Sequence, residues 1–450
     1  MHVYLIAPNW AKTYDESYPP APKGFFPPLG LLAVAALTPP HIEVSLTDES
    51  LEPVDFDRDA DLVGLTATTC VAPRAYQIAD RFRARGIKVV MGGMHASALP
   101  EEALRHVDAV VVGEAEGLWP RLLEDFARGE LQPIYRHREL PRLEGLPVPR
   151  RELIDPGRYV APFTLQATRG CVHQCTFCSV HVFFGRRFRT RPVDEVVAEA
   201  AQLEGKNLVF VDDNIMGHPS YAEKLFERLK DLRKNFLAQA STSILKTPQL
   251  IRKAAEAGCK ALFIGLETLS PKNLADIAKR VNVVEKYKEL VNRLHDNGIA
   301  IIGAFMLGLD DDDEGVFERT AEFAEKAQID VPQFSIVTPL PGTVFYEQLE
   351  REGRIIERDW SKYTGNHVCF RPRRLSVDKL NDGLRWIYER CYSWPSIIKR
   401  TAFRLRPLVW TLNALYRKQV MNWLKRVRGQ AQARGPYTRL RRKGDRPATP

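Results

Sequence analysis

The chain has 450 residues, of which 44% are hydrophobic and 27% are charged, with 28 glycines and 31 prolines. This composition is typical of a globular protein of two or three domains, and it excludes a chain that is disordered over most of its length. The longest apolar stretches, at 29–37 and 299–309, are far shorter than the roughly 20 residues that a membrane-spanning helix needs. Because the N-terminus lacks the basic segment of a signal peptide, we expect a cytoplasmic protein.

The formal net charge of +9 is concentrated near the C-terminus. From Lys399 onward, 15 Lys and Arg residues are opposed only by Asp445, whereas residues 1–398 hold 50 basic and 55 acidic residues. The body of the protein is therefore mildly acidic. Any inference about anionic partners concerns the tail alone.

Residues 1–130 alternate strand-like and helical patterns, which predicts a Rossmann-like, doubly wound parallel sheet. The strands are expected at 3–7, 41–48, 62–66, 88–91 and 109–112, and the helices at 29–37, 75–85 and 118–128. The loops after three of these strands contain Thr66, Thr68, Gly92, Gly93, Gly113 and Glu114. They stand at the carboxyl edge of the sheet, where such folds bind ligands.

Residues 131–160 are rich in Pro and Arg and are interpreted as a linker. Six further strands are expected at 164–168, 208–211, 237–241, 261–266, 299–307 and 331–337, with helices between them. This spacing predicts a partial (β/α)₆ barrel over residues 161–375. Residues 376–450 are expected to form a helical, basic tail.

Three of the seven cysteines form the pattern C-x₃-C-x₂-C: Cys171, Cys175 and Cys178. A disulfide framework is denser and even-numbered, so these cysteines indicate metal ligands in a reducing compartment. Zinc usually takes a second pair of ligands, and no matching pair follows. Three thiolates at this spacing fit a cubane iron–sulfur cluster whose fourth iron is open to another ligand.

With Phe177 as the aromatic residue before the last cysteine, the motif resembles that of the radical S-adenosylmethionine (SAM) superfamily. The first half of the chain resembles the subgroup with an N-terminal cobalamin-binding-type domain, through Pro27-Pro28-Leu29-Gly30, Gly92-Gly93-x-His95 and Val112-Gly113-Glu114-x-Glu116. The resemblance covers about residues 1–370. It implies a [4Fe–4S] cluster on the three cysteines and reductive cleavage of bound SAM to a 5′-deoxyadenosyl radical, with electrons from a low-potential donor such as flavodoxin or ferredoxin.

The resemblance also implies which residues hold the cofactors. For SAM they are Asp212, Asp213, Ser241, Glu267, Phe177 and Gly303, and for cobalamin Thr66, Thr68, Gly92, Gly93, Gly113 and Glu114. Solvated strand-end turns are the alternative for the carboxylates. The string Asp-x-His-x-x-Gly is absent, so no histidine is expected below the cobalt. A domain without cobalamin that only shapes the substrate cavity is the alternative reading.

Seven apolar residues of the tail fall on one helical stripe: Leu408, Leu412, Leu415, Val420, Trp423, Leu424 and Val427. A basic amphipathic helix of this kind is typical of a membrane-surface anchor, here on the inner face of the membrane. Nucleic-acid binding through the Arg-rich end is the less favoured alternative. A helix that packs on the barrel, followed by a disordered basic end, is the third.

The resemblance implies radical chemistry on an unactivated carbon of a hydrophobic natural product or lipid, with cobalamin-dependent C-methylation as the favoured reaction. Cyclisation or carbon–carbon bond formation without methyl transfer is the alternative within the superfamily. Methylthiolation of tRNA needs three more upstream cysteines, and only Cys70 lies there. A non-catalytic iron–sulfur or cobalamin sensor with a nucleic-acid-binding tail is the alternative from another class. The strand-end carboxylates Asp212, Asp213 and Glu267 argue against such a sensor, because it needs no SAM site. The sequence predicts no general acid or base.

Overall fold

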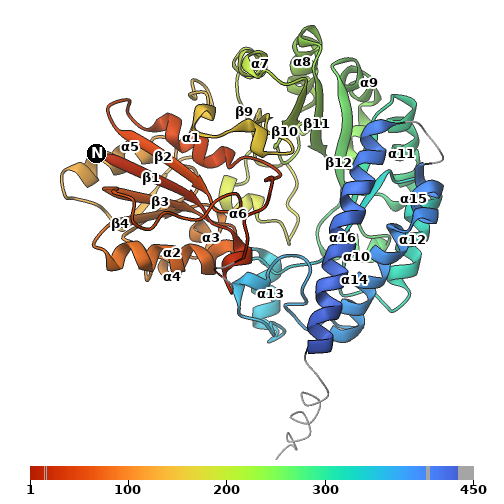
Figure 1. Ribbon diagram of the computed structural model, residues 1–450. Coiled ribbons are helices and arrows are strands. Elements are labelled where there is room, and N and C mark those ends of the chain that lie inside the picture. The colour runs from red at the N-terminus through yellow and green to blue at the C-terminus, as the bar shows by residue number, and fades with distance from the viewer. Residues whose placement is uncertain (15, 17, 402–405, 434–450) are drawn as a thin grey trace, which may run out of the picture.

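The computed structural model describes residues 1–14, 16, 18–401 and 406–433 (Figure 1). The first sheet comprises β1 (His2–Ala7), β2 (Glu43–Asp48), β3 (Leu62–Thr66), β4 (Lys88–Gly92), β5 (Ala109–Val112) and β6 (Ile134–Arg136). Its strand order is β2-β1-β3-β4-β5-β6, and all neighbours are parallel. The doubly wound parallel sheet is confirmed.

The two faces of this sheet carry separate hydrophobic cores. Along β1, Ile6 belongs to the core under α2 (Ala72–Ala84). Its neighbour Leu5 belongs to the core under α1 (Leu29–Leu37) and α5 (Leu118–Ala127). Because successive side chains of a strand point to opposite faces, a strand that is buried on both sides has an uninterrupted apolar sequence.

The first sheet extends beyond residue 130, into the stretch that the sequence suggests is a linker. β6 pairs with β5, and Tyr135 at its centre is buried, with its hydroxyl donating to Asp125 at 2.9 Å. A strand of three residues is too short to show a periodicity, which is why the pattern does not reveal it.

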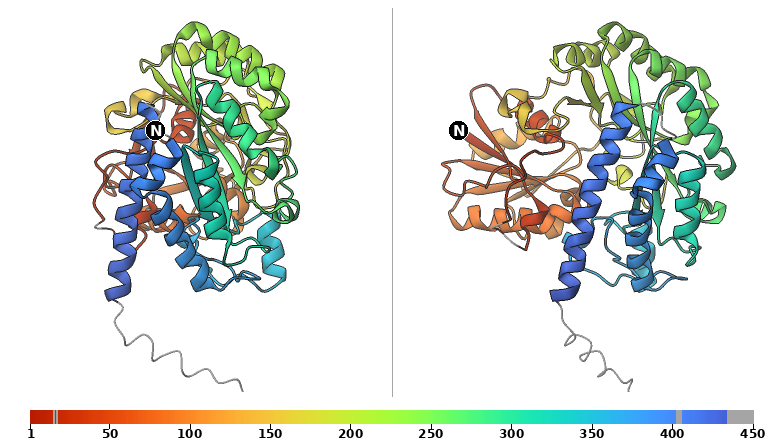
Figure 2. Two further views of the ribbon diagram at one scale, coloured as in Figure 1. Left: turned by 90° about the vertical axis from the view of Figure 1, so that its right-hand side faces the viewer. Right: turned by 45° about the vertical axis from the view of Figure 1, so that its right-hand side comes forward.

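The second sheet comprises β7 (Thr164–Leu165), β10 (Asn207–Phe210), β11 (Asn235–Ala240), β12 (Cys259–Glu267), β13 (Ala300–Leu307) and β14 (Val331–Ile336). The order is β14-β13-β12-β11-β10-β7, all parallel, and β14 and β7 do not pair with each other. Besides α6 (Val180–Phe184), the helices that alternate with these strands or follow them are α7 (Val193–Gln202), α8 (Pro219–Leu229), α9 (Pro248–Glu256), α10 (Pro271–Asp276), α11 (Tyr287–Asp296), α12 (Val316–Lys326) and α13 (Val344–Arg351). The partial barrel is confirmed (Figure 2).

The expected first barrel strand, 164–168, is interrupted. It consists of β7 and a separate β8 (Thr168–Arg169), which pairs antiparallel with β9 (Arg189–Thr190). The chain leaves the parallel sheet at Ala167, where two successive backbone amides donate to the Asp212 carboxylate instead of to a neighbouring strand.

The tail forms α14 (Val377–Cys391), α15 (Trp394–Thr401) and α16 (Pro407–Ala433). Val409 of α16 is 2% exposed and packs in one cluster with Ala261 and Ala300, near the starts of two barrel strands. Five of the six stripe residues whose side chains the structure describes belong to hydrophobic clusters of the barrel half: Leu408, Leu412, Val420, Trp423 and Leu424. The helix runs along the barrel (Figure 2), so the packed-helix alternative is confirmed for these five residues, whereas Leu415 is exposed. The side chain of Val427 and residues 434–450, with their Arg-rich end, lie outside the described residues. Within the part of the chain that the structure describes, no helix combines the length and apolar character of a membrane span.

A charge introduced at Val409 is expected to destabilise the fold. Val409→Asp buries a carboxylate without a partner, so we expect the free energy of unfolding to fall by several kcal/mol, on the order of 4. Denaturant unfolding measures the change. Leu415→Asp is the matched control, because Leu415 lies on the same helix and is 38% exposed. Equal effects at the two positions would contradict the packing of α16 on the barrel.

Candidate active site between two domains

The three cysteines lie in one loop between β8 and α6 (Val180–Phe184). Cys175 is buried, and Cys171 and Cys178 are half-buried. Burial raises the pKa of the Cys175 thiol, and that of Cys178 to about 12. Among the described residues, no three His, Cys, Asp or Glu side chains converge on one metal ion. A cubane cluster needs no such convergence, since each cysteine binds a different iron, and three thiols on one short loop fit that donor set.

Lys279 is a buried cation beside this loop that the sequence patterns do not reveal. Its Nζ lies 2.8 Å from Glu267 Oε1 and 6.0 Å from the centre of the Phe177 ring. Burial lowers the pKa of Lys279, but Glu267 and the Cys175 thiol outweigh it, so the pKa lies above its usual range. The Lys279 ammonium group is therefore held where two cysteines and a carboxylate face it. Glu267 reaches this place because its backbone turns left-handed at the end of β12, with φ of 67°.

The structure separates the roles of the adjacent carboxylates Asp212 and Asp213. Asp212 is fully buried and accepts hydrogen bonds from the Ala167 amide and from the amide and hydroxyl of Thr168, at 2.5–3.1 Å. Burial raises its pKa to about 7. Since its oxygens already accept hydrogen bonds inside the protein, Asp212 is less suited than its neighbour to contact SAM, and that contact stays a prediction. Asp212 fixes the backbone that leads to the cysteines.

The carboxylate of Asp213 is not fully hydrogen-bonded within the described residues. The Gly170 amide, next to Cys171, faces this carboxylate and lowers its pKa, while Oδ2 is buried and has no partner among the described residues. Burial raises the pKa of Asp213 to about 6. An unpaired carboxylate oxygen beside the cluster loop fits the ammonium group of a SAM molecule bound there.

Ser241 lies where β11 ends and contacts the cluster loop. Its Oγ is 2.6 Å from Ser243 Oγ and 3.3 Å from both Asn214 Nδ2 and His173 Nε2. The ends of two barrel strands and the cysteine loop therefore meet in one polar patch. Gly303 lies four residues before the end of β13, and a Cβ there would stand 2.9 Å from Ile329. Its missing side chain leaves room for that packing.

Asp212 and Asp213 are expected to respond differently to the same substitution. Asp213→Asn removes the charge that faces an ammonium, so we expect SAM affinity to fall roughly 10- to 100-fold, with stability changed by less than about 0.5 kcal/mol. Asp212→Asn places amide donors against backbone donors, and we expect it to destabilise the fold by about 2 kcal/mol. Equilibrium binding of SAM and denaturant unfolding measure the two effects. If the Asp212→Asn variant folds and loses SAM affinity while the Asp213→Asn variant keeps it, the roles of the two carboxylates would be reversed.

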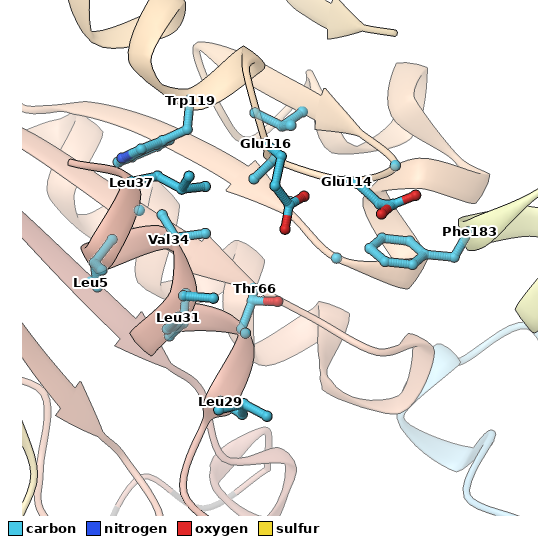
Figure 3. A pocket seen from close by; sticks show the side chains of 18 of the residues that line it. Leu5, Leu29, Leu31, Val34, Leu37, Thr66, Glu114, Glu116, Trp119 and Phe183 are labelled. Carbon is cyan, nitrogen blue, oxygen red and sulfur yellow. The ribbon is translucent and has the colours of Figure 1, made fainter. Parts of the chain in front are cut away.

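A cavity of about 260 Å³ opens at the carboxyl ends of β3, β4 and β5 (Figure 3). Of the residues expected to bind cobalamin, Thr66, Gly92, Gly93, Gly113 and Glu114 line it, and Thr68 does not. The remaining wall is largely apolar and includes Leu31, Val34 and Leu37 of α1 and Trp119 of α5. Gly93 has φ of 94°, and a Cβ there would collide with Thr66 and the Ala67 backbone at 2.7–2.9 Å. An apolar cavity with glycine loops fits one part of a molecule as large as cobalamin.

The barrel domain completes this cavity. Arg169, Phe183 and Phe184 contribute to its lining. Arg169 donates to Glu114 at 2.5 Å and to Glu116 at 2.6 Å, and Arg189 also pairs with Glu114. These charges come from both domains and are nearly all out of solvent.

A second contact between the domains lies beside α2. His95 is fully buried, and its Nε2 lies 3.1 Å from both Tyr76 Oη and Glu102 Oε1. Glu102 also accepts from the indole of Trp360 at 2.9 Å. His95 therefore contributes to the contact between the domains, and its ring lies 5.5 Å from that of Trp360.

Comparisons with known proteins agree with this architecture. The family model "Radical SAM superfamily" matches residues 165–324, and the model "B12 binding domain" matches residues 21–123. The bacteriochlorophyllide d C-12(1)-methyltransferase of Chlorobaculum tepidum is 34% identical over 401 residues, which cover 86% of this chain and 87% of that protein. The hopanoid C-2 methylase of Rhodopseudomonas palustris is 27% identical over 379 residues, covering 79% of this chain and 71% of that one.

A solved structure shows the same fold. The cobalamin-dependent SAM radical enzyme OxsB, with aqua-cobalamin and SAM bound, matches with a TM-score of 0.68 over 94% of this chain and 72% of that chain, at 16% identity. The two domain matches and the full-length relative together settle the family and its cofactors, a [4Fe–4S] cluster, SAM and cobalamin. The chain belongs to the radical SAM enzymes with an N-terminal B12-binding domain, the family that includes these methyltransferases.

Proposed function

We propose that this enzyme methylates an unactivated carbon of a hydrophobic, ring-containing natural product or lipid. The observation that carries the proposal is the position of α6 between the cysteine loop and the glycine-lined cavity. This helix begins two residues after Cys178, and Phe183 and Phe184 at its end line the glycine-lined cavity (Figure 3). A cluster on the cysteines and a cobalamin at the cavity would therefore face one space between the domains. The relatives act, by name, on a bacteriochlorophyllide and on hopanoids, which are both largely apolar ring systems.

The bound cofactors supply the chemistry: an electron for the cleavage of SAM to a 5′-deoxyadenosyl radical that removes a hydrogen atom, and a methyl group carried by cobalamin. The protein's own residues bind and orient. In this proposal Cys171, Cys175 and Cys178 hold the cluster and Asp213 accepts the SAM ammonium. Ser241 faces the SAM carboxylate and Glu267, kept in place by Lys279, faces the ribose hydroxyls. The aromatic wall of α6 keeps water from the space between the cofactors.

Partners and location follow from this chemistry and from the tail. Cleavage of SAM consumes an electron, so a low-potential donor such as flavodoxin or ferredoxin is proposed as the redox partner. Cytoplasmic location with peripheral binding to the inner membrane face stays a prediction for the basic C-terminal end, since the described apolar stripe packs on the barrel. Flotation with anionic vesicles at moderate salt tests it.

The proposed reaction is tested with SAM that carries a deuterated methyl group. The reconstituted enzyme is incubated under a strong reductant with a bacteriochlorophyllide-type pigment or a hopanoid, with and without hydroxocobalamin. We expect labelled methyl in the product only when cobalamin is present, together with 5′-deoxyadenosine. A changed product without the label would replace methylation by cyclisation or carbon–carbon bond formation. Failure to cleave SAM would contradict radical SAM chemistry as a whole.

A further inference from the structure

Three consecutive residues lie between the cobalamin cavity and the cysteine loop. Arg169 contacts two carboxylates that line the cavity, Gly170 lies beside Asp213, and Cys171 is the first of the three cysteines. We propose that this tripeptide couples the cobalamin cavity to the cluster, so that binding of cobalamin changes the affinity of the enzyme for SAM. The inference rests on the cofactor set. It goes beyond the proposed reaction, because it holds whatever the substrate is.

The first link is the side chain of Arg169, which crosses to the B12-binding domain. Its guanidinium donates to Glu114 at 2.5 Å, to Glu116 at 2.6 Å and, within its own domain, to Gln166 at 2.9 Å. The side chains of Arg169, Glu114 and Glu116 are 12%, 1% and 11% exposed. Separating buried partners leaves uncompensated charges, so Arg169 has to follow any shift of the two carboxylates. Both carboxylates line the cavity (Figure 3).

The second link is Gly170, whose backbone leaves little freedom. It has φ of 83°, and a Cβ there would lie 2.4 Å from the Arg187 carbonyl oxygen. Its amide faces Asp213, the carboxylate with the unpartnered buried oxygen. A displacement of Arg169 is therefore passed to the residue that we propose for the SAM ammonium and to Cys171, which follows directly.

The cysteine loop also contacts the cavity at its other end. Phe183, near the end of α6, follows Cys178 by five residues and lines the cavity. The cation of Arg169 lies 5.9 Å from the centre of the Phe184 ring, so the two ends meet. A ligand that enters the cavity touches the segments on both sides of the cluster ligands.

The coupling is measured as a ratio of affinities in the cluster-loaded protein. SAM affinity is titrated without cobalamin and at saturating hydroxocobalamin, and cobalamin affinity is titrated with and without SAM. In the wild type we expect saturating hydroxocobalamin to change the affinity for SAM at least about fivefold. Reciprocity then requires SAM to change the affinity for cobalamin by the same factor. The electron paramagnetic resonance signal of the reduced cluster is expected to change when cobalamin is added.

Glu114→Gln is expected to reduce the ratio of SAM affinities with and without cobalamin to less than about twofold. It is also expected to remove the effect of cobalamin on the cluster signal. Glu116→Gln, which leaves both arginine pairs of Glu114 in place, is expected to reduce the ratio partly. It serves as the main variant if Glu114→Gln does not fold. Glu49→Gln is the matched control, because Glu49 is a fully buried partner of Arg74 within the B12-binding domain and does not line the cavity. We expect it to keep the wild-type ratio.

Three outcomes would overturn the inference: a wild-type ratio of one, a wild-type ratio retained in both Glu114→Gln and Glu116→Gln, or an equal loss in Glu49→Gln. A wild-type protein that binds no cobalamin would overturn the coupling together with the cofactor assignment. Normal coupling without methyl transfer would leave the inference standing and remove the proposed reaction.

Discussion

Replacing Cys171, Cys175 and Cys178 together by alanine is expected to remove about four iron atoms per chain and to abolish SAM cleavage, while cobalamin is still bound. The separation follows from the architecture, because the cysteines lie in the barrel domain and none of them lines the cavity. Iron and cobalt are quantified after anaerobic reconstitution with iron, sulfide and hydroxocobalamin.

Cys259→Ala provides the control for the loss of a buried thiol. Cys259 is 2% exposed at the start of β12, so its variant is expected to keep its iron. Iron that stays bound in the triple variant would place the cluster elsewhere. Loss of cobalt together with iron would show that the two sites do not assemble independently.

Gly30→Trp is expected to abolish cobalamin binding and leave the cluster in place. Gly30 lines the cavity from α1, and a Cβ at this position would meet no atom within 4 Å. An indole added there occupies cavity space without displacing the core, so methyl transfer is lost while iron content stays normal. Cobalt content with the visible absorption of bound cobalamin, transfer of the labelled methyl group and iron content measure the three effects.

Gly30→Ala distinguishes a blocked cavity from a damaged helix. Alanine fills little space and restricts the unfolded chain, so this variant is expected to bind cobalamin normally and to be more stable by about 0.5–1 kcal/mol. Wild-type cobalamin binding by Gly30→Trp would mean that the cofactor lies outside this cavity.

The strands of both sheets could be predicted from the sequence because they are buried on both faces. A nearly uninterrupted apolar run locates β13, and the apolar residues of β12 and β14 locate these strands, to within two residues of their observed ends. β6 could not be found in the same way, since a single buried residue, Tyr135, carries its packing. The apolar stripe of α16 is visible in the sequence, but an amphipathic pattern does not say whether a membrane or a protein covers it.

The candidate site was predictable where spacing along the chain determines geometry. The three cysteines are close in sequence, and a short loop keeps them close in space. Asp212 and Asp213 are neighbours of identical chemistry, and only the fold shows that one is used by the Thr168 backbone while the other has an oxygen free. Lys279 lies 12 residues from its partner Glu267, in a stretch without a motif, so its burial depends on tertiary contacts.

The pairing of Arg169 and Arg189 with Glu114 and Glu116 limits how this enzyme can be recombined with its relatives. Two positive and two negative charges cancel across the domain boundary, and 53 to 75 residues separate the partners along the chain. A hybrid that takes its first domain from one family member and its barrel from another inherits half of the set from each parent. Such a hybrid stays balanced only when both parents place matching charges at all four positions, and in diverging lineages the four positions are expected to change as a set.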